Sequence, residues 1–168
     1  MKWSFLTLFY KLSHPKVKYE QIPYWYKRSL VGQIWHVIRK WICQVWAPNC
    51  ATTALRIGLY RLCGFKIGGG TFIGMKCYLD DLCVDKIEIG KNVIISYGVY
   101  FACHGPRQGH NKIVIKDKAY IGMRANIIAP HDIEIGEGAV VGAQTLVNKS
   151  VPAGRTAVGI PCRILDNK

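Results

Sequence analysis

A six-residue spacing of aliphatic side chains governs the sequence from residue 67 onward. Each aliphatic residue is followed, four positions later, by a small or β-branched residue, and glycine directly follows it in six of nine segments. Repeats of six residues are typical of a parallel β-helix, in which three short strands form one triangular coil and stacked coils share an apolar core. The segments begin at Ile67, Ile73, Ile89, Ile95, Ile115, Ile121, Ile135, Val141 and Val147.

The repeat is interrupted in three places, where we expect loops that carry function. Residues 79–87 form an irregular stretch rich in acids, and residues 101–115 contain the turn-rich sequence CHGPRQGHNK. Residues 127–135 hold two residues more than the repeat requires. After Val151 the sequence PAGRTAVGIPCRIL leaves the pattern, and we expect it to cap the end of the β-helix.

The front of the chain is strongly basic. Residues 1–66 contain eleven Lys and Arg and one acid, Glu20, whereas residues 67–168 contain twelve against nine. Residues 24–46 are predicted to form one aromatic helix, with an apolar stripe made of Leu30, Ile34, Ile38 (or Val37), Trp41 and Val45. A second helix is predicted over 51–63. We therefore expect a basic helical extension over 1–63 and a hexapeptide-repeat domain over 64–168.

Two interpretations of the basic helix stay open. A basic amphipathic helix with tryptophans suits the surface of an anionic membrane, which predicts peripheral association through residues 24–46. The alternative is a helix that packs on its own solenoid or on a neighbouring subunit. No nucleic-acid motif accompanies the charge, so we expect no nucleic-acid partner. No apolar run is long enough to span a bilayer and no secretory signal is expected, which predicts a cytoplasmic protein.

The seven cysteines indicate a reducing compartment. Their number is odd and no CxxC occurs, so neither a disulfide framework nor a structural zinc site is expected. Cys103 is predicted to be a small buried residue rather than a nucleophile. His104, directly after a strand and at the start of the second interruption, is a candidate general base because its pKa lies close to working pH.

Four segments carry a resemblance to a known family: ISYGVYFACHG, IVIKDKAYIGMRANII, IEIGEGAVVGAQTLVNKSVPAG and AVGIPCRIL. Over residues 56–165 the chain resembles the hexapeptide acyltransferase superfamily, and within it the sugar O-acetyltransferases of the maltose/galactoside and colanic-acid/capsule types. The resemblance implies a left-handed parallel β-helix and homotrimers with active sites at subunit interfaces. It also implies direct acetyl transfer from acetyl-CoA to a sugar hydroxyl in surface-glycan biosynthesis, with no metal.

The resemblance assigns roles to residues of this chain. His104 would take the proton from the acceptor hydroxyl, and Asp80 or Asp81 would lie on the acceptor side together with Tyr97. The cofactor would contact Tyr120, Met123 and Ala143 along the outside of the coils. Its phosphates would lie near the last repeat, where the residues that match the family pattern are Asn148, Lys149 and Arg163.

Other functions remain open at this point. An amino sugar could be the acceptor of an N-acetyl transfer, and the β-helix could serve as a non-catalytic scaffold. A zinc protein of the γ-carbonic anhydrase type would use three histidines, for which His104, His110 and His131 are available. The six-residue spacing between the first two does not match the five-residue spacing of that family.

Overall fold

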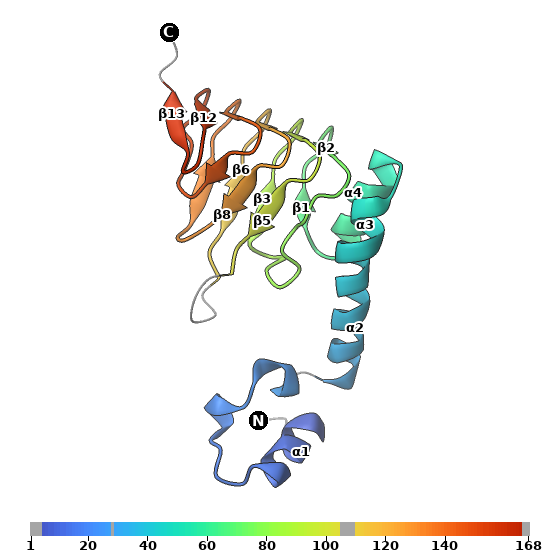
Figure 1. Cartoon of the computed structure of the whole chain (residues 1–168). Coiled ribbons are helices and arrows are strands. Elements are labelled where there is room, and N and C mark those ends of the chain that lie inside the picture. The colour runs from blue at the N-terminus through green and yellow to red at the C-terminus, as the bar shows by residue number, and fades with distance from the viewer. Residues whose placement is uncertain (1–4, 28, 105–109, 166–168) are drawn as a thin grey trace. The chain divides into compact units, whose positions relative to one another are not determined.

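The computed structural model describes residues 5–27, 29–104 and 110–165 (Figure 1). The chain divides into two compact units, Met1–Trp41 and Ile42–Lys168. The predicted domain boundary between residues 63 and 64 stays a prediction. Within the described residues, no helix combines the length and the apolar character that a membrane crossing would need.

The N-terminal unit is helical. Its elements are α1 (Phe5–Ser13), two short 3-10 turns, η1 (Tyr19–Gln21) and η2 (Tyr24–Lys27), and α2 (Leu30–Trp41). The prediction of one continuous helix over 24–46 is wrong. The hydroxyl of Ser29 accepts the N–H of Gly32 at 3.1 Å, and this cap starts a new helix at Leu30.

The second unit opens with short helical elements before the solenoid. A π-helical turn, η3 (Ile42–Trp46), leads into α3 (Ala47–Asn49), where Pro48 lacks the N–H that a longer helix would need. The predicted helix over 51–63 is confirmed as α4 (Thr53–Leu62).

Three sheets form the faces of the solenoid, and their strands are parallel except for the last strand of the second sheet (Figure 1). The first contains β1 (Lys66–Ile67), β3 (Ile87–Ile89), β6 (Ile113–Ile115) and β9 (Ile133–Ile135). The second contains β2 (Phe72–Ile73), β4 (Ile94–Ile95), β7 (Tyr120–Ile121), β10 (Val140–Val141), β12 (Thr156–Val158) and β13 (Arg163–Leu165). The third contains β5 (Tyr100–Ala102), β8 (Asn126–Ile128) and β11 (Leu146–Val147). The predicted fold class, a mainly β parallel β-helix with an N-terminal helical extension, is confirmed.

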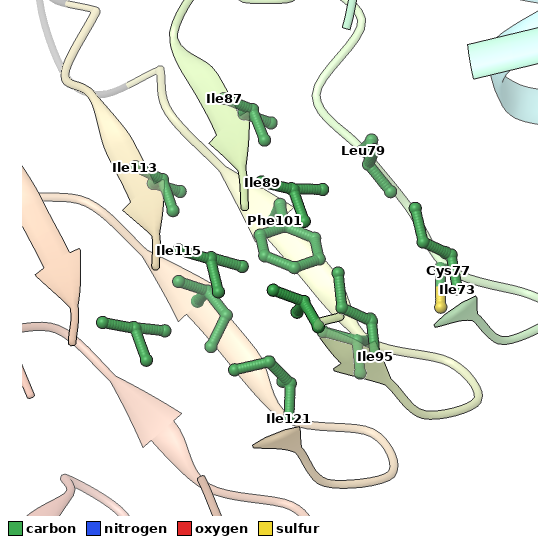
Figure 2. Packing of buried hydrophobic residues seen from close by; sticks show 14 of the residues in the cluster. Ile73, Cys77, Leu79, Ile87, Ile89, Ile95, Phe101, Ile113, Ile115 and Ile121 are labelled. Atoms are coloured by element: carbon green, nitrogen blue, oxygen red, sulfur yellow. The ribbon is translucent and has the colours of Figure 1, made fainter. Parts of the chain in front are cut away.

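The register of the strands places each repeat above the equivalent residue of the previous coil. Ile95 pairs with Ile121, and Ile121 with Val141, and all three are fully buried. Figure 2 shows Ile73, Ile95 and Ile121 in this interior among the isoleucines of the first sheet and Phe101. The small residues four positions later, such as Ala119 and Ala125, are buried as well. The interior is therefore a continuous apolar column, as the repeat predicts.

Glycine follows the buried aliphatic residue because neighbouring coils approach too closely for a side chain there. A Cβ added at Gly122 would lie 2.5 Å from the main-chain N of Ala143, and one at Gly74 would lie 2.7 Å from that of Tyr97. At these corners the coils are also hydrogen-bonded, since the N–H of Gln144 donates to the carbonyl of Met123 at 2.8 Å.

Both ends of the solenoid are covered. Helix α4 packs on the first coil, where the buried Arg56 donates Nη1 to the carbonyl of Ile73 at 2.5 Å. The hydroxyl of Tyr60 donates to the carbonyl of Cys77 at 3.0 Å, and burial raises the pKa of this phenol. At the other end, β13 pairs antiparallel with β12, so the segment after Val151 caps the β-helix as predicted.

Adjacent residues of β4 provide a test of the core. Ile95 is fully buried and Ile94 is 45% exposed. We expect Ile95→Ala to lower the free energy of unfolding by about 2–5 kcal/mol, because it leaves a cavity in the stacked column. The control Ile94→Ala should cost less than about 1 kcal/mol in the same urea titration. Equal losses would show that the column does not carry the stability.

Glu88 joins neighbouring coils on the outside of the first sheet. Its carboxylate accepts Lys66 Nζ at 2.8 Å and Lys112 Nζ at 2.9 Å, and these two partners lower its pKa to about 2. A lowered pKa means that the contribution to stability is complete above the ordinary value of 4.5 and is lost as the pH falls toward 2.

Replacing Glu88 by glutamine should therefore change how stability depends on pH. At pH 7 we expect Glu88→Gln to lower the free energy of unfolding by about 1 kcal/mol or less, since the pairs are partly solvated. The difference from the wild type should vanish between pH 4.5 and 2. Thermal unfolding over this pH series measures it, and a constant difference down to pH 2 would contradict the assignment.

Candidate active site

The interruptions of the repeat all fall at one corner of the solenoid, where the third sheet leads into the first. They lie between Leu79 and β3, between β5 and β6, and between β8 and β9. Tyr78 forms a parallel bridge with Tyr100 on the next coil, and their rings stack with centroids 4.3 Å apart. This register brings the residues just after Tyr78 beside those just after β5.

Asp80 and His104 meet at this corner. The carboxylate Oδ2 of Asp80 lies 2.6 Å from Nδ1 of His104. The same oxygen accepts the main-chain N–H groups of Cys103 at 2.9 Å and His104 at 3.2 Å, while Oδ1 accepts the N–H of Leu82 at 3.2 Å. The Asp80 side chain is fully buried, whereas that of His104 is 42% exposed.

This contact determines the tautomer of the imidazole. With the carboxylate of Asp80 as acceptor, Nδ1 of His104 carries the proton, and Nε2 keeps its lone pair. The buried carboxylate also fixes the orientation of the ring, because three main-chain N–H groups hold Asp80 itself in place. The pair can therefore act as an oriented general base that is open to solvent on the side of the histidine.

Asp81 points to a different partner. Its Oδ1 accepts Nε2 of Gln44, from η3, at 2.8 Å, and its side chain is buried. Its buried Oδ2 has no hydrogen-bond partner within the described residues. The structure thus separates the two aspartates that the sequence leaves as alternatives: Asp80 contacts His104 and Asp81 contacts Gln44. Their assignment to the acceptor side stays a prediction.

Three predicted cofactor or substrate residues share another edge, between the second and third sheets. Tyr97, Met123 and Ala143 follow β4, β7 and β10 on successive coils and are all exposed. Main-chain bonds connect this edge, since the carbonyl of Tyr97 accepts the N–H of Arg124 at 2.9 Å. Tyr120 lies on the neighbouring outer face of β7, and its hydroxyl is 3.3 Å from Oγ of Ser96.

The predicted phosphate-binding residues lie at the C-terminal end of the solenoid. Asn148 and Lys149 directly follow β11, and Arg163 begins β13 with an exposed side chain. The N–H of Cys162 donates to the carbonyl of Leu146 in β11 at 2.9 Å. This bond ties the segment that carries Arg163 to the strand that precedes Lys149. The roles of these residues in phosphate binding stay predictions.

The sequence analysis missed two contacts of this site, the bond between Asp80 and His104 and the one between Gln44 and Asp81. The sequence does contain a signal for the contact between Asp80 and His104, because both residues directly follow inward-facing segments of successive coils. The interruptions differ in length, however, so the spacing of 24 residues between Asp80 and His104 does not reveal their register.

The neighbouring thiol does not join the pair, and His110 lies beside His104 through an antiparallel main-chain bridge. Cys103 is fully buried, and burial raises the pKa of its thiol, so the prediction of a small buried residue is confirmed. His110 and His131 are exposed. Residues 105–109, between His104 and His110, lie outside the described residues. In the described ranges, no group of three or more His, Cys, Asp or Glu side chains is placed to hold a metal ion.

No model of a known protein family matches the chain. The putative acetyltransferase YvoF of Bacillus subtilis (strain 168) is 36% identical over 155 residues, which cover 83% of this chain and 88% of YvoF. The bifunctional protein GlmU of Rubrobacter xylanophilus is 35% identical over 108 residues, or 61% of this chain. The chain spans only 22% of the length of that protein.

Two solved structures share the fold. The hexapeptide-repeat-containing acetyltransferase VCA0836 from Vibrio cholerae, in complex with acetyl coenzyme A, matches with a TM-score of 0.58 and 20% identity. This match covers 82% of this chain and 89% of VCA0836. A maltose O-acetyltransferase from Clostridium difficile 630 matches with a TM-score of 0.57 and 25% identity, covering 77% of this chain and 84% of that one.

The burial of the thiols is open to a direct test. Six of the seven cysteines are buried, and Cys50 alone is partly exposed. We expect a thiol reagent to modify Cys50 rapidly in the folded protein and the other six cysteines only on unfolding. Cys50→Ser should abolish the rapid phase. Rapid modification of Cys103 in the folded protein, located by peptide mapping, would contradict its burial.

Proposed function

Since the chain belongs to the hexapeptide-repeat acetyltransferase superfamily, we propose that it transfers an acetyl group from acetyl-CoA to a hydroxyl of a sugar. The observation that carries the proposal is the pair formed by buried Asp80 and partly exposed His104. It supplies an oriented base at a corner of the solenoid. A base of this kind is what a hydroxyl needs before it can attack a thioester.

The reaction proceeds by direct transfer. Nε2 of His104 takes the proton of the acceptor hydroxyl as its oxygen attacks the thioester carbonyl carbon. The tetrahedral intermediate then expels the thiolate of CoA, which recovers the proton from the imidazolium. Asp80 stabilises the positive charge that His104 carries between these steps, because its carboxylate accepts the Nδ1 proton at 2.6 Å. No acyl-enzyme forms, which agrees with the burial of Cys103.

Acetyl-CoA lies along the edge that carries Met123 and Ala143, with Tyr120 beside it, and Tyr97 on the preceding coil of that edge serves the acceptor side. This edge is exposed over successive coils, and an extended pantetheine arm can follow it. Lys149 and Arg163, both exposed near the end of the solenoid, bind the phosphates, with Asn148 beside them. The acetyl-CoA complex of VCA0836, which has the same fold, supports this donor.

A sugar is the acceptor that we propose, supported by the match to the maltose O-acetyltransferase. The match to the maltose O-acetyltransferase covers 84% of that enzyme, so the similarity extends over most of its length. Asp81, one of whose buried carboxylate oxygens has no partner among the described residues, lies next to Asp80 and serves the acceptor side. We place the product in surface-glycan biosynthesis and the reaction in the cytoplasm, which the free cysteines suit.

The active form is a homotrimer with its sites at subunit interfaces. An apolar row on the outer face of the second sheet supports this assembly. Ile94, Tyr120 and Val140 are paired in register on successive coils, and they are 45%, 42% and 37% exposed. A continuous apolar row on a solenoid face is suited to contact with another subunit. Tyr120 would then lie where one subunit meets the next.

Removing the base tests the proposal. We expect His104→Ala to lower kcat by about 10²–10⁴-fold while leaving acetyl-CoA binding unchanged, because the base acts only in the chemical step. The measurements are calorimetric binding of acetyl-CoA and CoA release with a panel of sugars. His131→Ala is the matched control, since this exposed histidine lies outside the pair and should leave both quantities unchanged. Absence of acetyl-CoA binding by the wild type would favour a scaffold.

Asp80→Asn separates positioning from catalysis. An amide in this place holds the ring less well and stabilises the imidazolium less, so kcat should fall at least about tenfold with KM for acetyl-CoA unchanged.

The panel of acceptors used to measure CoA release also includes glucosamine and serine. Acetylation of the amine alone, or of serine alone, would contradict a sugar hydroxyl as the acceptor.

A further inference from the structure

The apolar side of helix α1 faces away from its own unit. Four large apolar side chains occupy positions i, i+3, i+4 and i+7 of the helix, which places them on one face. All are strongly exposed: Phe5 is 70%, Leu8 50%, Phe9 60% and Leu12 74% exposed. A helix of a globular protein ordinarily buries such a face against its core.

The other side of α1 is the one that holds the helix in place. Thr7 is fully buried, and its hydroxyl donates to the carbonyl of Tyr26 at 2.6 Å. The ring of Tyr10 packs against that of Tyr26 with centroids 4.6 Å apart, and Lys11 Nζ donates to the carbonyl of Val17 at 2.6 Å. The orientation of α1 is therefore set by polar and aromatic contacts, and its apolar face is left without cover.

Helix α2 has the same property, since none of its residues is buried. Its exposed apolar side chains include Val31 at 77%, Ile34 at 61% and Val37 at 56%. Two tryptophans are also exposed, Trp35 at 40% and Trp41 at 57%. Aromatic and aliphatic residues on a short helix are typical of a segment that lies in a membrane interface.

The charge of this segment limits what can cover these faces. Residues 1–41 contain eight Lys and Arg and one acid, Glu20. Two copies of this unit would repel each other, which disfavours self-association through these faces. A surface of anionic lipids accepts both features, because the acyl region takes up apolar side chains and the phosphates attract the basic ones.

We propose that residues 5–41 bind the surface of an anionic membrane. The apolar faces of α1 and α2 enter the boundary between headgroups and acyl chains, and lysines such as Lys16, Lys18 and Lys40 contact lipid phosphates. This inference goes beyond the proposed function and does not depend on it. It extends the predicted membrane segment to α1, whose outward face the sequence analysis did not consider.

Co-sedimentation of the full chain with vesicles tests this inference. We expect binding to phosphatidylcholine vesicles that contain about 30% phosphatidylglycerol, weak binding to phosphatidylcholine alone, and a marked loss in about 0.5 M salt. Phe9→Asp should lower the partition coefficient about tenfold or more, because it places a charge on the inserted face. Emission from Trp35 and Trp41 should shift to shorter wavelength on binding.

Leu62→Asp is the matched control, because Leu62 of α4 is 62% exposed and Phe9 60%, yet it lies outside the proposed surface. It should bind vesicles like the wild type. Failure of the wild type to bind anionic vesicles would overturn the proposal, and so would binding that Phe9→Asp leaves unchanged. Sedimentation without lipid adds a third criterion. If Phe9→Asp dissociates an oligomer and leaves vesicle binding intact, this face contacts protein and the proposal is wrong.

Discussion

Parallel main-chain ladders hold successive coils one strand spacing apart, as in the row Ile89, Ile115 and Ile135. This spacing controls most of the sequence from residue 67 onward. The interior takes mainly one aliphatic and one small residue per face, and in six of nine segments a glycine follows the aliphatic residue, where an added Cβ would lie within 3.0 Å of the next coil. Chemistry therefore cannot reside in the interior, and it must be carried by the corners, the outer faces and the interruptions.

The candidate active site follows from that restriction. Interruptions at one corner stack above each other because the coils do, and this stacking places Asp80 behind His104. Burying a carboxylate is costly unless it is fully hydrogen-bonded, and here four N–H groups from successive segments satisfy it. The rigid solenoid thus supplies a preorganised base, and the outer faces remain available for a donor and for neighbouring subunits.

The N-terminal unit obeys a different rule. In the solenoid, the apolar side chains of the repeat point inward, and the strand ladders fix which residues of successive coils lie above each other. In α1 the buried residue is Thr7, and Tyr10 packs against the ring of Tyr26, while phenylalanines and leucines face outward. Local polar contacts stabilise such a segment, and its apolar side chains stay exposed and can contact an external surface. Its excess of basic residues favours an external surface of negative charge.

The sequence by itself determined the parallel β-helix and its interior residues, because a six-residue period can be counted along the chain, and it also predicted helix α4. It also determined that Cys103 is buried. It failed over residues 24–46, where the cap at Ser29 starts a new helix at Leu30 that is separate from the short turn η2. Only the tertiary structure decided that Asp80, and not Asp81, supports His104, since interruptions of unequal length hide the register between coils. Only the tertiary structure likewise showed that the apolar face of α1 is exposed, because an amphipathic pattern does not indicate which face of a helix packs against the rest of the protein.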